Sequence, residues 1–465
     1  MALRLYNTLT RTIDEVVPLE GRDLRLYACG PTVYDFVHIG NFRTFTFQDL
    51  LRRYLLYKGF GLTHVMNITD VDDKIINGAG ARGEPIQEYT KRYTQAFLED
   101  MEALRLQRPE IMPRATRHIA QMVDLIVRLR RKGLTYEQDG STYYRIDGLP
   151  AYGGLSRLDL HEAERGDATD ADEYSKDNPR DFVLWKARKP GEAYWDTALG
   201  PGRPGWHIEC SAMSMEYLGE SFDLHAGGVD LVFPHHENEI AQSEGATGRP
   251  FVRHWVHSAH LVVEGEKMSK SRGNFYTLRD LLDQGWDPLA VRYLLLSVHY
   301  RKQLNFSFQG MIQAQSALQR VNDFIQRLRE VPGEAEENRD LMEAALQAER
   351  NFESSLDDDL NTSAALAAIF ELVRKGNLLL EKSQVGGPDR DAVLGFFSKV
   401  NAIFETFQLE TLELEDDEVA RLIQERTVAR QTRDYARADQ IRSLLARKGI
   451  VLEDTREGTR WKRAT

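Results

Sequence analysis

The sequence predicts a Rossmann-like α/β domain, built on a parallel sheet and interrupted by an insertion, followed by all-α C-terminal domains. Three patterns support this prediction. The first 70 residues alternate strand, helix and strand; strand patterns return after an irregular region; and the pattern beyond about Asp287 is nearly all helical. A chain of 465 residues also exceeds the length at which one hydrophobic core stops growing, so several domains are expected.

The strand, helix and strand near the N-terminus are typical of a βαβ unit in a parallel sheet. Residues 25–28 and 63–68 have the pattern of strands, and residues 45–57 have apolar positions at helical spacing. Ligands of such sheets bind at the carboxyl ends of the strands. Cys29 and Thr69 both lie at these ends.

A helical stretch is expected from Ile86 to about Lys132, followed by a less regular region, 135–200, that is rich in Gly, Asp and Tyr. We interpret this region as an insertion because strand patterns resume at 223–228 and 257–263. Beyond it, Asp287 and Pro288 suit a helix start, since proline is tolerated in the first turn.

Composition narrows the class of protein. The chain is 42% hydrophobic and 28% charged, as soluble globular proteins are. It has no apolar run of about 18 residues, so no membrane span is expected, and its first residues lack the pattern of a secretory signal. Two cysteines cannot form a disulfide framework, which favours a reducing cytoplasm. The net charge of −12 argues against a uniformly basic nucleic-acid binder.

Charge is nevertheless uneven near the C-terminus. Residues 409–418 are strongly acidic, whereas residues 421–465 hold twelve lysines and arginines against six acids. This contrast is compatible with a negatively charged polymer gripped at selected points, and also with an ordinary solvated helix face. Trp461 in this segment suits either stacking on a base or internal packing.

The two cysteines, Cys29 and Cys210, both lie in polar surroundings, and the cluster His235 to Glu239 follows the second. His235 and Glu239 are four residues apart and would share one face of a helix. A sulfur, nitrogen and oxygen set of this kind suits zinc. The cysteines lack a Cys-x-x-Cys spacing, so buried core thiols and a surface His–Glu pair stay open as alternatives. The sequence is not His-Glu-x-x-His, which disfavours a metalloprotease.

Two further segments have the residues to handle phosphate. His38-Ile39-Gly40-Asn41 begins a helix, where free N–H groups and partial positive charge favour anions. Lys267 to Asn274 forms a loop with two lysines that could stabilise charge on a triphosphate. The sequence has no Gly-x-x-x-x-Gly-Lys-Ser/Thr loop, so a P-loop mechanism is not expected.

These two segments resemble the His-Ile-Gly-His and Lys-Met-Ser-Lys-Ser signatures of class I aminoacyl-tRNA synthetases, and nearly the whole chain resembles the cysteinyl-tRNA synthetase family. The resemblance also rests on five longer motifs, which are Cys29 to Asp35, Asn67 to Lys74, Gly205 to Met213, Phe233 to Gln242 and Gly449 to Thr455. Asn41 departs from the signature, which has histidine there. Asn41 can donate a hydrogen bond but carries no positive charge.

The resemblance implies roles for individual residues. One zinc ion per chain would be held by Cys29, Cys210, His235 and Glu239. ATP would be bound by His38, Gly40, Asn41, Lys267, Ser269 and Lys270, with His38, Asn41, Lys267 and Lys270 acting in catalysis. The cysteine substrate would be surrounded by Thr69, Trp206, His225 and Asp230.

The implied activity is ATP-dependent ligation of L-cysteine to the 3′ end of tRNA(Cys) through a cysteinyl-adenylate, by a cytoplasmic monomer. Mg²⁺ would accompany ATP. Zinc would select the substrate thiolate over the nearly isosteric serine, which a pocket selecting by size rejects by only about 1–3 kcal/mol. Positioning and electrostatic stabilisation suffice for both steps, so no protein nucleophile is needed.

The resemblance also implies a domain plan. The domains would be a split catalytic domain (1–134 and 201–265), a connective insertion (135–200), a Lys-Met-Ser-Lys-Ser loop and stem-contact region (266–312), a helical bundle (313–405) and an anticodon-binding domain (406–465).

Two alternatives are kept. A cysteine ligase of mycothiol biosynthesis would use the same adenylation core but pass cysteine to an amino sugar, and it would be shorter at the C-terminus. A non-catalytic zinc-dependent RNA-binding protein would not need the lysine loop, 267–271.

Overall fold

A four-stranded parallel sheet forms the centre of the fold, as expected for a Rossmann-like domain. Its strand order is β11-β10-β3-β4, with bounds β3 Asp23–Ala28, β4 Gly61–Met66, β10 Phe222–Gly228 and β11 Val252–Ser258. Helix α1 (Ile39–Tyr57) links β3 to β4. Ala28 pairs with both Ala226 and Met66, so the carboxyl ends of the strands meet at one edge.

The computed structural model describes residues 2–157, 181–333, 337–409, 416–432, 434–447, 450–455 and 458–463. The chain divides into two units. The first comprises Met1–Leu282 and Trp286–Phe407, and the second Asp283–Gly285 and Gln408–Thr465. Within the described residues, every helix falls short of the length and apolar character that crossing a membrane requires.

Helix α1 begins six residues earlier than its apolar periodicity indicates. His38 is its N-cap, and the His38 imidazole accepts a hydrogen bond from the Asn41 backbone N–H at 3.1 Å. Ile39 and Phe42 in the first turn are apolar and buried, but Gly40 and Asn41 between them are weak helix formers, which weakens the helical pattern there. The cap thus places Gly40 and Asn41, which are predicted to bind the nucleotide, on the first turn of α1.

The predicted helical stretch from Ile86 to Lys132 is wrong as one continuous element. It forms α3 (Ile86–Ala103) and α4 (Ile119–Arg131), with an intervening segment that contains Pro109 and Pro113. Proline removes a backbone donor and clashes with the preceding turn, so helix cannot continue there. A shorter helix, α2 (Asp73–Arg82), precedes this pair.

The insertion is more regular than the sequence indicates. Its described residues form an antiparallel five-stranded sheet of order β5-β6-β7-β9-β8, with bounds Thr135–Gln138, Ser141–Tyr144, Phe182–Ala187, Gly200–Pro204 and Trp195–Thr197 respectively. The strands are short, and their pairing is set by aromatic contacts such as Tyr144 on Phe182, with ring centroids 5.0 Å apart. Residues 158–180 of the predicted insertion lie outside the described part.

The strand predicted at 257–263 is also wrong as one element. Its first residues end β11, whereas Leu261–Val263 forms β12 in a separate sheet with β13 (Glu266–Lys267) and β14 (Leu304–Phe306). At the N-terminus, β1 (Arg4–Asn7) and β2 (Thr12–Glu15) form a hairpin that the pattern did not predict.

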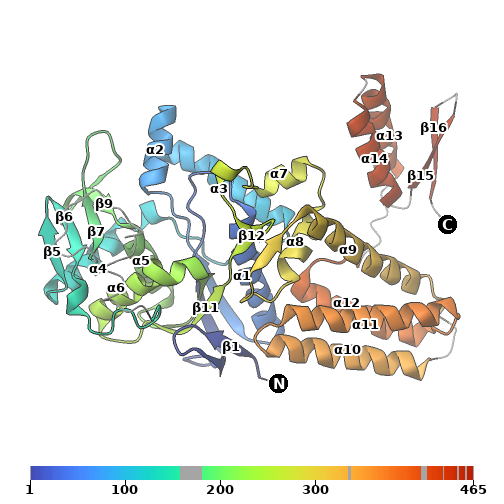
Figure 1. Ribbon diagram of the computed structural model, residues 1–465, viewed down its shortest axis with the longest axis horizontal. Coiled ribbons are helices and arrows are strands. Elements are labelled where there is room, and N and C mark those ends of the chain that lie inside the picture. Colours follow the sequence, from blue (N-terminus) through green and yellow to red (C-terminus); the bar gives the residue numbers. More distant parts are fainter. Residues whose placement is uncertain are drawn as a thin grey trace. The chain divides into compact units, whose positions relative to one another are not determined.

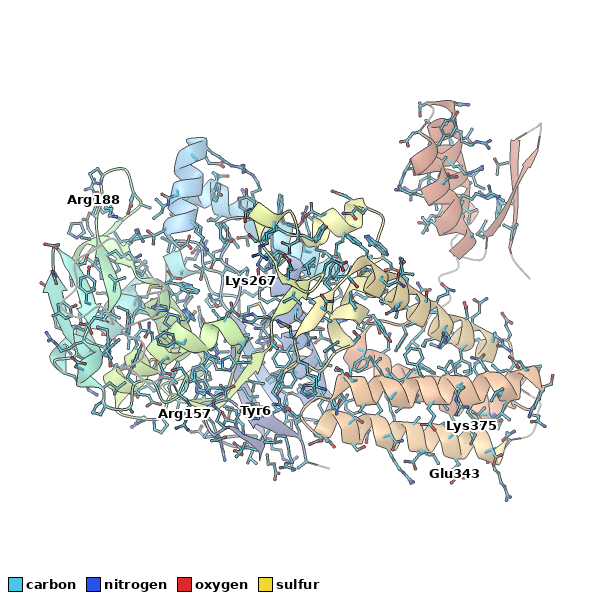
Figure 2. The ribbon with its side chains drawn as sticks, viewed as in Figure 1. Tyr6, Arg157, Arg188, Lys267, Glu343 and Lys375 are labelled. Atoms are coloured by element: carbon cyan, nitrogen blue, oxygen red, sulfur yellow. The ribbon has the colours of Figure 1, made fainter. Side chains whose placement is uncertain are left out.

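Helices cover the sheet and then continue as a bundle, shown with its four long helices side by side in Figure 1. Helices α1 and α5 (Trp206–Leu218) contact the sheet, α6 (Glu237–Thr247) packs on α5, and α8 (Pro288–Leu296) packs on α1. Helix α7 spans Leu278–Asp283. The bundle helices are α9 Phe308–Arg329, α10 Arg339–Asp357, α11 Thr362–Glu381 and α12 Gly387–Phe404. Figure 2 places Glu343 and Lys375 on this bundle, at the opposite end of the first unit from Arg188 of the insertion.

Buried ion pairs fasten the bundle to the sheet domain. Asp49 in α1 contacts the guanidinium groups of Arg53 at 2.9 Å and Arg292 at 2.5 Å. Arg292, which is fully buried, also donates to the Phe404 and Leu104 carbonyls that end α12 and lie just after α3. These contacts join α1, α3, α8 and α12 and explain why one unit extends to Phe407.

The second unit has its own small core. It contains α13 (Asp416–Gln431), α14 (Tyr435–Arg447) and a hairpin of β15 (Ile450–Thr455) and β16 (Gly458–Arg463). Its buried apolar residues are Val419, Leu422, Ile441, Leu445 and Ile450. Trp461 packs against this core, which favours the packing alternative for that residue. The sequence predicted the helices of this region but not the hairpin.

Candidate metal centre and nucleotide site

Four predicted ligands converge beneath the carboxyl edge of the sheet. Cys29, Cys210, His235 and Glu239 each offer one ligand atom, and these atoms all lie within 4.8 Å of one another. All four side chains are buried. Two sulfurs, an imidazole nitrogen and a carboxylate oxygen at this spacing form a donor set that fits zinc.

Three elements bring these ligands together. Cys29 directly follows β3, and Cys210 lies in α5. His235 lies in a π-helical turn, Val232–His236, that leads into α6 with Glu239. The chain patterns therefore placed Cys29 correctly at a strand end. The π-helical turn sets the direction in which His235 faces Glu239, at 3.1 Å.

Neighbouring side chains fix the orientation of the ligands. His207 Nδ1 lies 2.9 Å from His235 Nδ1, which leaves His235 Nε2 directed toward Glu239. His225 Nε2 lies 3.0 Å from the other Glu239 oxygen. His236 Nε2 lies 3.3 Å from the Cys29 sulfur. Such outer contacts set the tautomer and direction of metal ligands.

His225, His236, Cys29 and Glu239 form a second convergent group. It shares Cys29 and Glu239 with the predicted set, so the two groups describe one site. We assign His225 and His236 to supporting contacts, because the first set supplies both sulfurs. His236 approaches the strand end closely: a Cβ on Gly227 would lie 2.7 Å from the His236 ring.

Sequence reasoning missed three residues of this site: His207, His236 and His257. His236 Nδ1 lies 2.8 Å from His257 Nε2, and His257 Nδ1 lies 2.7 Å from the Thr8 hydroxyl. One available signal was that His257 lies near the carboxyl end of β11, the edge at which Cys29 lies. For His207, the available signal was its position three residues before Cys210 in the sequence.

The cluster strongly perturbs its own ionisation. A hydrogen bond from Cys29 is the main cause that lowers the pKa of the Cys210 thiol to about 6. Burial is the main cause that raises the pKa of Cys29 well above its ordinary value. Burial opposes a charged Glu239, but His225 and His235 outweigh it and lower the pKa of Glu239 to about 2. One thiol and the carboxylate are thus readily ionised, as metal ligands must be.

The four predicted substrate residues lie at different depths around the cluster. Thr69 is buried, and its hydroxyl donates to Glu209 at 3.3 Å, next to Cys210 in the chain. Trp206 is 38% exposed, and its ring centroid lies 4.2 Å from that of His235. His225 is within the cluster, as described above. Asp230 is exposed, and its charge acts on both Cys29 and His38.

The helix cap carries a neutral imidazole. Burial is the main cause that lowers the pKa of His38 to about 4, and the Lys270 charge acts in the same direction. Because His38 Nδ1 accepts the Asn41 N–H, Nε2 carries the proton and can donate it in a hydrogen bond. Gly40 lies against the lysine loop, since its Cβ would approach Met268 Cε to 3.1 Å.

The lysine loop is placed over the start of α1. The Ile39 N–H donates to the Tyr276 carbonyl at 3.0 Å, and the Ser269 N–H donates to Asn274 Oδ1 at 2.8 Å. Lys270 Nζ lies 2.5 Å from Asp35 Oδ2, and this hydrogen bond raises the Lys270 pKa. Lys267 is exposed on β13, near β12 in Figure 2. The structure thus brings His38, Gly40 and the lysine loop together.

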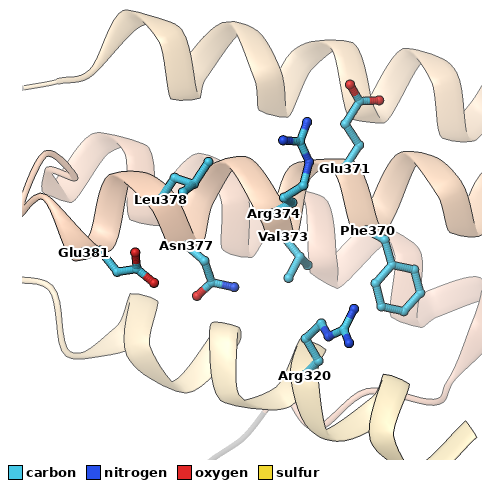
Figure 3. Close-up of a pocket in the computed structure, with 8 residues that line it drawn as sticks. All are labelled: Arg320, Phe370, Glu371, Val373, Arg374, Asn377, Leu378 and Glu381. Atoms are coloured by element: carbon cyan, nitrogen blue, oxygen red, sulfur yellow. The ribbon is translucent and has the colours of Figure 1, made fainter. Parts of the chain in front are cut away.

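A separate groove lies in the helical bundle, between α9 and α11 (Figure 3). Its volume is about 540 Å³. The lining residues are Arg320, Phe370, Glu371, Val373, Arg374, Asn377, Leu378 and Glu381. None of them is a predicted site residue, and the opposed charges of the lining do not favour one class of ligand.

Comparison with known proteins identifies the class. Residues 15–316 match the model of the class I (C) tRNA synthetase catalytic domain, and residues 351–407 match the DALR domain. The fold is similar to that of Mycobacterium tuberculosis methionyl-tRNA synthetase in complex with methionyl-adenylate. The TM-score is 0.63, at 16% identity over 84% of this chain and 92% of that one.

The parallel sheet, the capped helix and the lysine loop together define a class I tRNA synthetase. Curated relatives narrow this further. The chain is 52% identical, over the full length of both proteins, to the cysteine–tRNA ligase of Solibacter usitatus, and 49% identical to that of Koribacter versatilis with the same coverage. The chain belongs to the cysteine–tRNA ligase family. The predicted fold class and family are therefore confirmed.

Proposed function

We propose that the chain activates L-cysteine with ATP and transfers the cysteinyl group to the 3′ end of tRNA(Cys), as a cytoplasmic monomer. Family membership supports the ligase activity. The observation that carries the choice of cysteine is the buried cluster of Cys29, Cys210, His235 and Glu239 beside the helix cap. A sulfur-containing donor set of this kind suits a site for a soft ligand such as a thiolate.

The metal proposed for this cluster is one zinc ion per chain. When bound, zinc would supply a Lewis acid that accepts a thiolate much more readily than a hydroxyl. Thr69 and Trp206 border the cluster and would shape the space for a small side chain. The charge of Asp230 acts on both Cys29 and His38, and its carboxylate would receive the substrate ammonium group.

The nucleotide would lie against the first turn of α1. The neutral His38 donates a hydrogen bond to a phosphate oxygen, and the Asn41 side-chain amide adds a second donor. Lys267 and Lys270 neutralise charge on the triphosphate, with Ser269 in the same loop. Mg²⁺ would accompany ATP and be held mostly by phosphate oxygens and water. Attack by the cysteine carboxylate on the α-phosphorus then needs no protein nucleophile.

Cysteine-dependent ATP–pyrophosphate exchange tests the first step. We expect exchange with cysteine and not with serine, and expect tRNA, but not an amino sugar, to accept the cysteinyl group. Serine exchange at a comparable rate would contradict the role of the metal cluster. Exchange without tRNA charging would contradict the proposed acceptor.

The two alternative functions are not favoured. Both relatives described above are full-length matches that carry the ligase name, and this chain has a second unit beyond Phe407. The predicted domain plan stays a proposal, in which the second unit reads the anticodon. Size-exclusion chromatography with light scattering would test the monomeric state.

A further inference from the structure

A cluster of aromatic rings and cations lies beside the nucleotide site. We call it the mouth platform, and its residues are Tyr34, Phe36, Lys74, Arg82, Tyr89 and Tyr93. They come from the loop between β3 and α1, from α2 and from α3. None of them has a role in the activity proposed above.

The rings of Phe36, Tyr93 and Tyr89 form a chain of edge-to-face contacts. The ring centroids of Tyr89 and Tyr93 are 5.1 Å apart, and those of Phe36 and Tyr93 are 5.3 Å apart. The Tyr89 hydroxyl donates to the Tyr34 carbonyl at 2.7 Å. Tyr89 and Tyr93 are buried, whereas Phe36 is 38% exposed. The two buried tyrosines therefore support the Phe36 ring, which stays partly exposed although the Arg279 guanidinium lies over it, 5.2 Å from its centroid.

Close packing of α2 on α3 holds this support in place. A Cβ on Gly78 would lie 2.3 Å from the Tyr89 hydroxyl oxygen, so only glycine allows α2 to approach this closely. Arg82, at the end of α2, donates to the Tyr93 hydroxyl at 3.2 Å. The helix packing and this hydrogen bond thus hold the two tyrosines beneath Phe36.

Two cations of the mouth platform form no ion pair within the described residues, although the charge of Lys74 acts on the Asp72 carboxylate. Lys74 Nζ lies 5.0 Å from the Tyr34 ring centroid, and the Arg82 guanidinium lies 5.7 Å from that of Tyr89. Both are exposed, and neither forms an ion pair with another residue in the described part of the chain. In a protein of net charge −12, two exposed cations without ion pairs beside an aromatic ring favour an anionic ligand.

The mouth platform also borders the reacting groups. Asp35, between Tyr34 and Phe36, contacts Lys270 of the lysine loop, and His38 follows two residues after Phe36. The tRNA hydroxyl must reach the adenylate in this region during transfer. The last unpaired nucleotides of the tRNA consequently pass over residues next to the nucleotide site.

The geometry points to the mouth platform as the surface that holds the unpaired 3′ end of the tRNA. Phe36 stacks on one base, because every base offers an apolar face to an aromatic ring. Lys74 and Arg82 neutralise the adjoining phosphates. This inference rests on the proposed function and adds the residues that receive the acceptor strand.

Substitution of Phe36 tests the stacking contact. Base–aromatic stacking contributes about 1–3 kcal/mol, so F36L should raise the KM for tRNA roughly 5- to 150-fold. Cysteine-dependent ATP–pyrophosphate exchange should be unchanged, and F36W should restore the KM. Y217L, which removes a ring of similar exposure (39%) at the end of α5, is the matched control.

Binding of a truncated tRNA, and the salt dependence of binding, distinguish contacts with the 3′ end from other contacts with the tRNA. F36L should not weaken binding of a tRNA that lacks its unpaired 3′ nucleotides. K74Q and R82Q should each reduce the slope of log affinity against log salt by about 0.7, as expected for one single-strand phosphate. K132Q, which removes an exposed lysine at the end of α4, should leave the slope unchanged.

The outcomes separate this inference from the proposed function. An equal loss of affinity for intact and truncated tRNA in F36L, or unchanged slopes in K74Q and R82Q, would overturn the mouth platform alone. A wild-type protein that exchanges pyrophosphate but charges no tRNA would overturn both. A loss of affinity in F36L that occurs only with tRNA whose 3′ end is intact would support the inference.

Discussion

Cys210 shows how the metal cluster depends on single residues. It is fully buried in α5, and its hydrogen bond with Cys29 is the main cause that lowers its pKa to about 6. Loss of an outer contact already weakens metal binding by about 10- to 100-fold, so loss of a sulfur ligand should cost more. C210S should therefore lose bound zinc and cysteine-dependent pyrophosphate exchange together.

Zinc content after dialysis, together with chelator competition, measures this effect directly. S214A is the matched control, since Ser214 is buried in the same helix but lies outside the cluster. A C210S protein that retains its zinc and still rejects serine would show that the cluster has been assigned wrongly.

A second prediction at the scale of single residues concerns His38 and the pH dependence of folding stability. Burial lowers its pKa to about 4, whereas an exposed histidine has a pKa near 6.5. The unfolded chain therefore takes up this proton first as the pH falls. Stability from the neutral imidazole is complete above pH 6.5 and is lost as the pH falls toward 4. The loss at pH 4.5 should be about 2–3 kcal/mol.

Urea unfolding of the wild type and H38Q at pH 7 and pH 4.5 checks this value. The difference in unfolding free energy between the two proteins should shrink at the lower pH, because H38Q has no proton to gain. An identical pH dependence for both would contradict a buried neutral imidazole.

Much of the site could be predicted from residue patterns, for a physical reason. Cys29 and Thr69 follow strands, and parallel strands bring their carboxyl ends to one edge. Grouping Cys210 and His235 with Cys29 needed the family resemblance, because no local spacing links them. The support by His207 and His257 depends on side-chain contacts across elements, which a sequence pattern does not encode.

At the scale of elements, the contacts of Arg292 join α8 to α1 and α12. Arg292 is fully buried and pairs with Asp49, which also pairs with Arg53. Removing one partner of a buried ion pair costs about 3–5 kcal/mol, since the remaining charge is left without compensation. R292M should lower the unfolding free energy of the first unit by about 3 kcal/mol, with Arg53 limiting the loss.

Chemical unfolding followed by tryptophan fluorescence measures this change. R320M is the control, because Arg320 is exposed on α9 and lines the bundle groove. If R292M unfolds at the same urea concentration as R320M, the buried network does not hold the bundle in place.

Some helices and strands could be predicted from the sequence, and others could not. The βαβ unit was predictable because its strands and helix have distinct local periodicities. The sheet of the insertion was not, because short antiparallel strands such as β8 and β9 are fixed by partners outside their own segment. Pro109 and Pro113 indicate a break between α3 and α4. The helical periodicity on both sides of them nevertheless suggested one continuous helix.

At the scale of the whole molecule, the proposed function divides activation and tRNA recognition between the two units. The metal cluster and helix cap lie in the first unit, and the second has a core of its own. A chain ending at Phe407 should therefore form cysteinyl-adenylate at the wild-type rate. Its tRNA charging should fall by more than roughly tenfold, because loss of several specific contacts at about 1–3 kcal/mol each removes most discrimination.

Pyrophosphate exchange and tRNA charging, measured on the same preparation, test this division. A melting temperature close to that of the first transition of the full chain would show that the remaining unit is folded. Undiminished charging by the shortened chain would exclude the second unit from tRNA recognition.

The metal cluster has one more consequence, for the abundance of the protein. The four ligands come from three distant segments, which contain Cys29, Cys210, and His235 with Glu239. An ion that joins them therefore acts as a cross-link between distant parts of the first unit. Stability gained from a ligand rises with the logarithm of its free concentration. Cells short of zinc would then hold less folded enzyme, and the supply of a nutrient metal would set the rate at which cysteine enters new proteins.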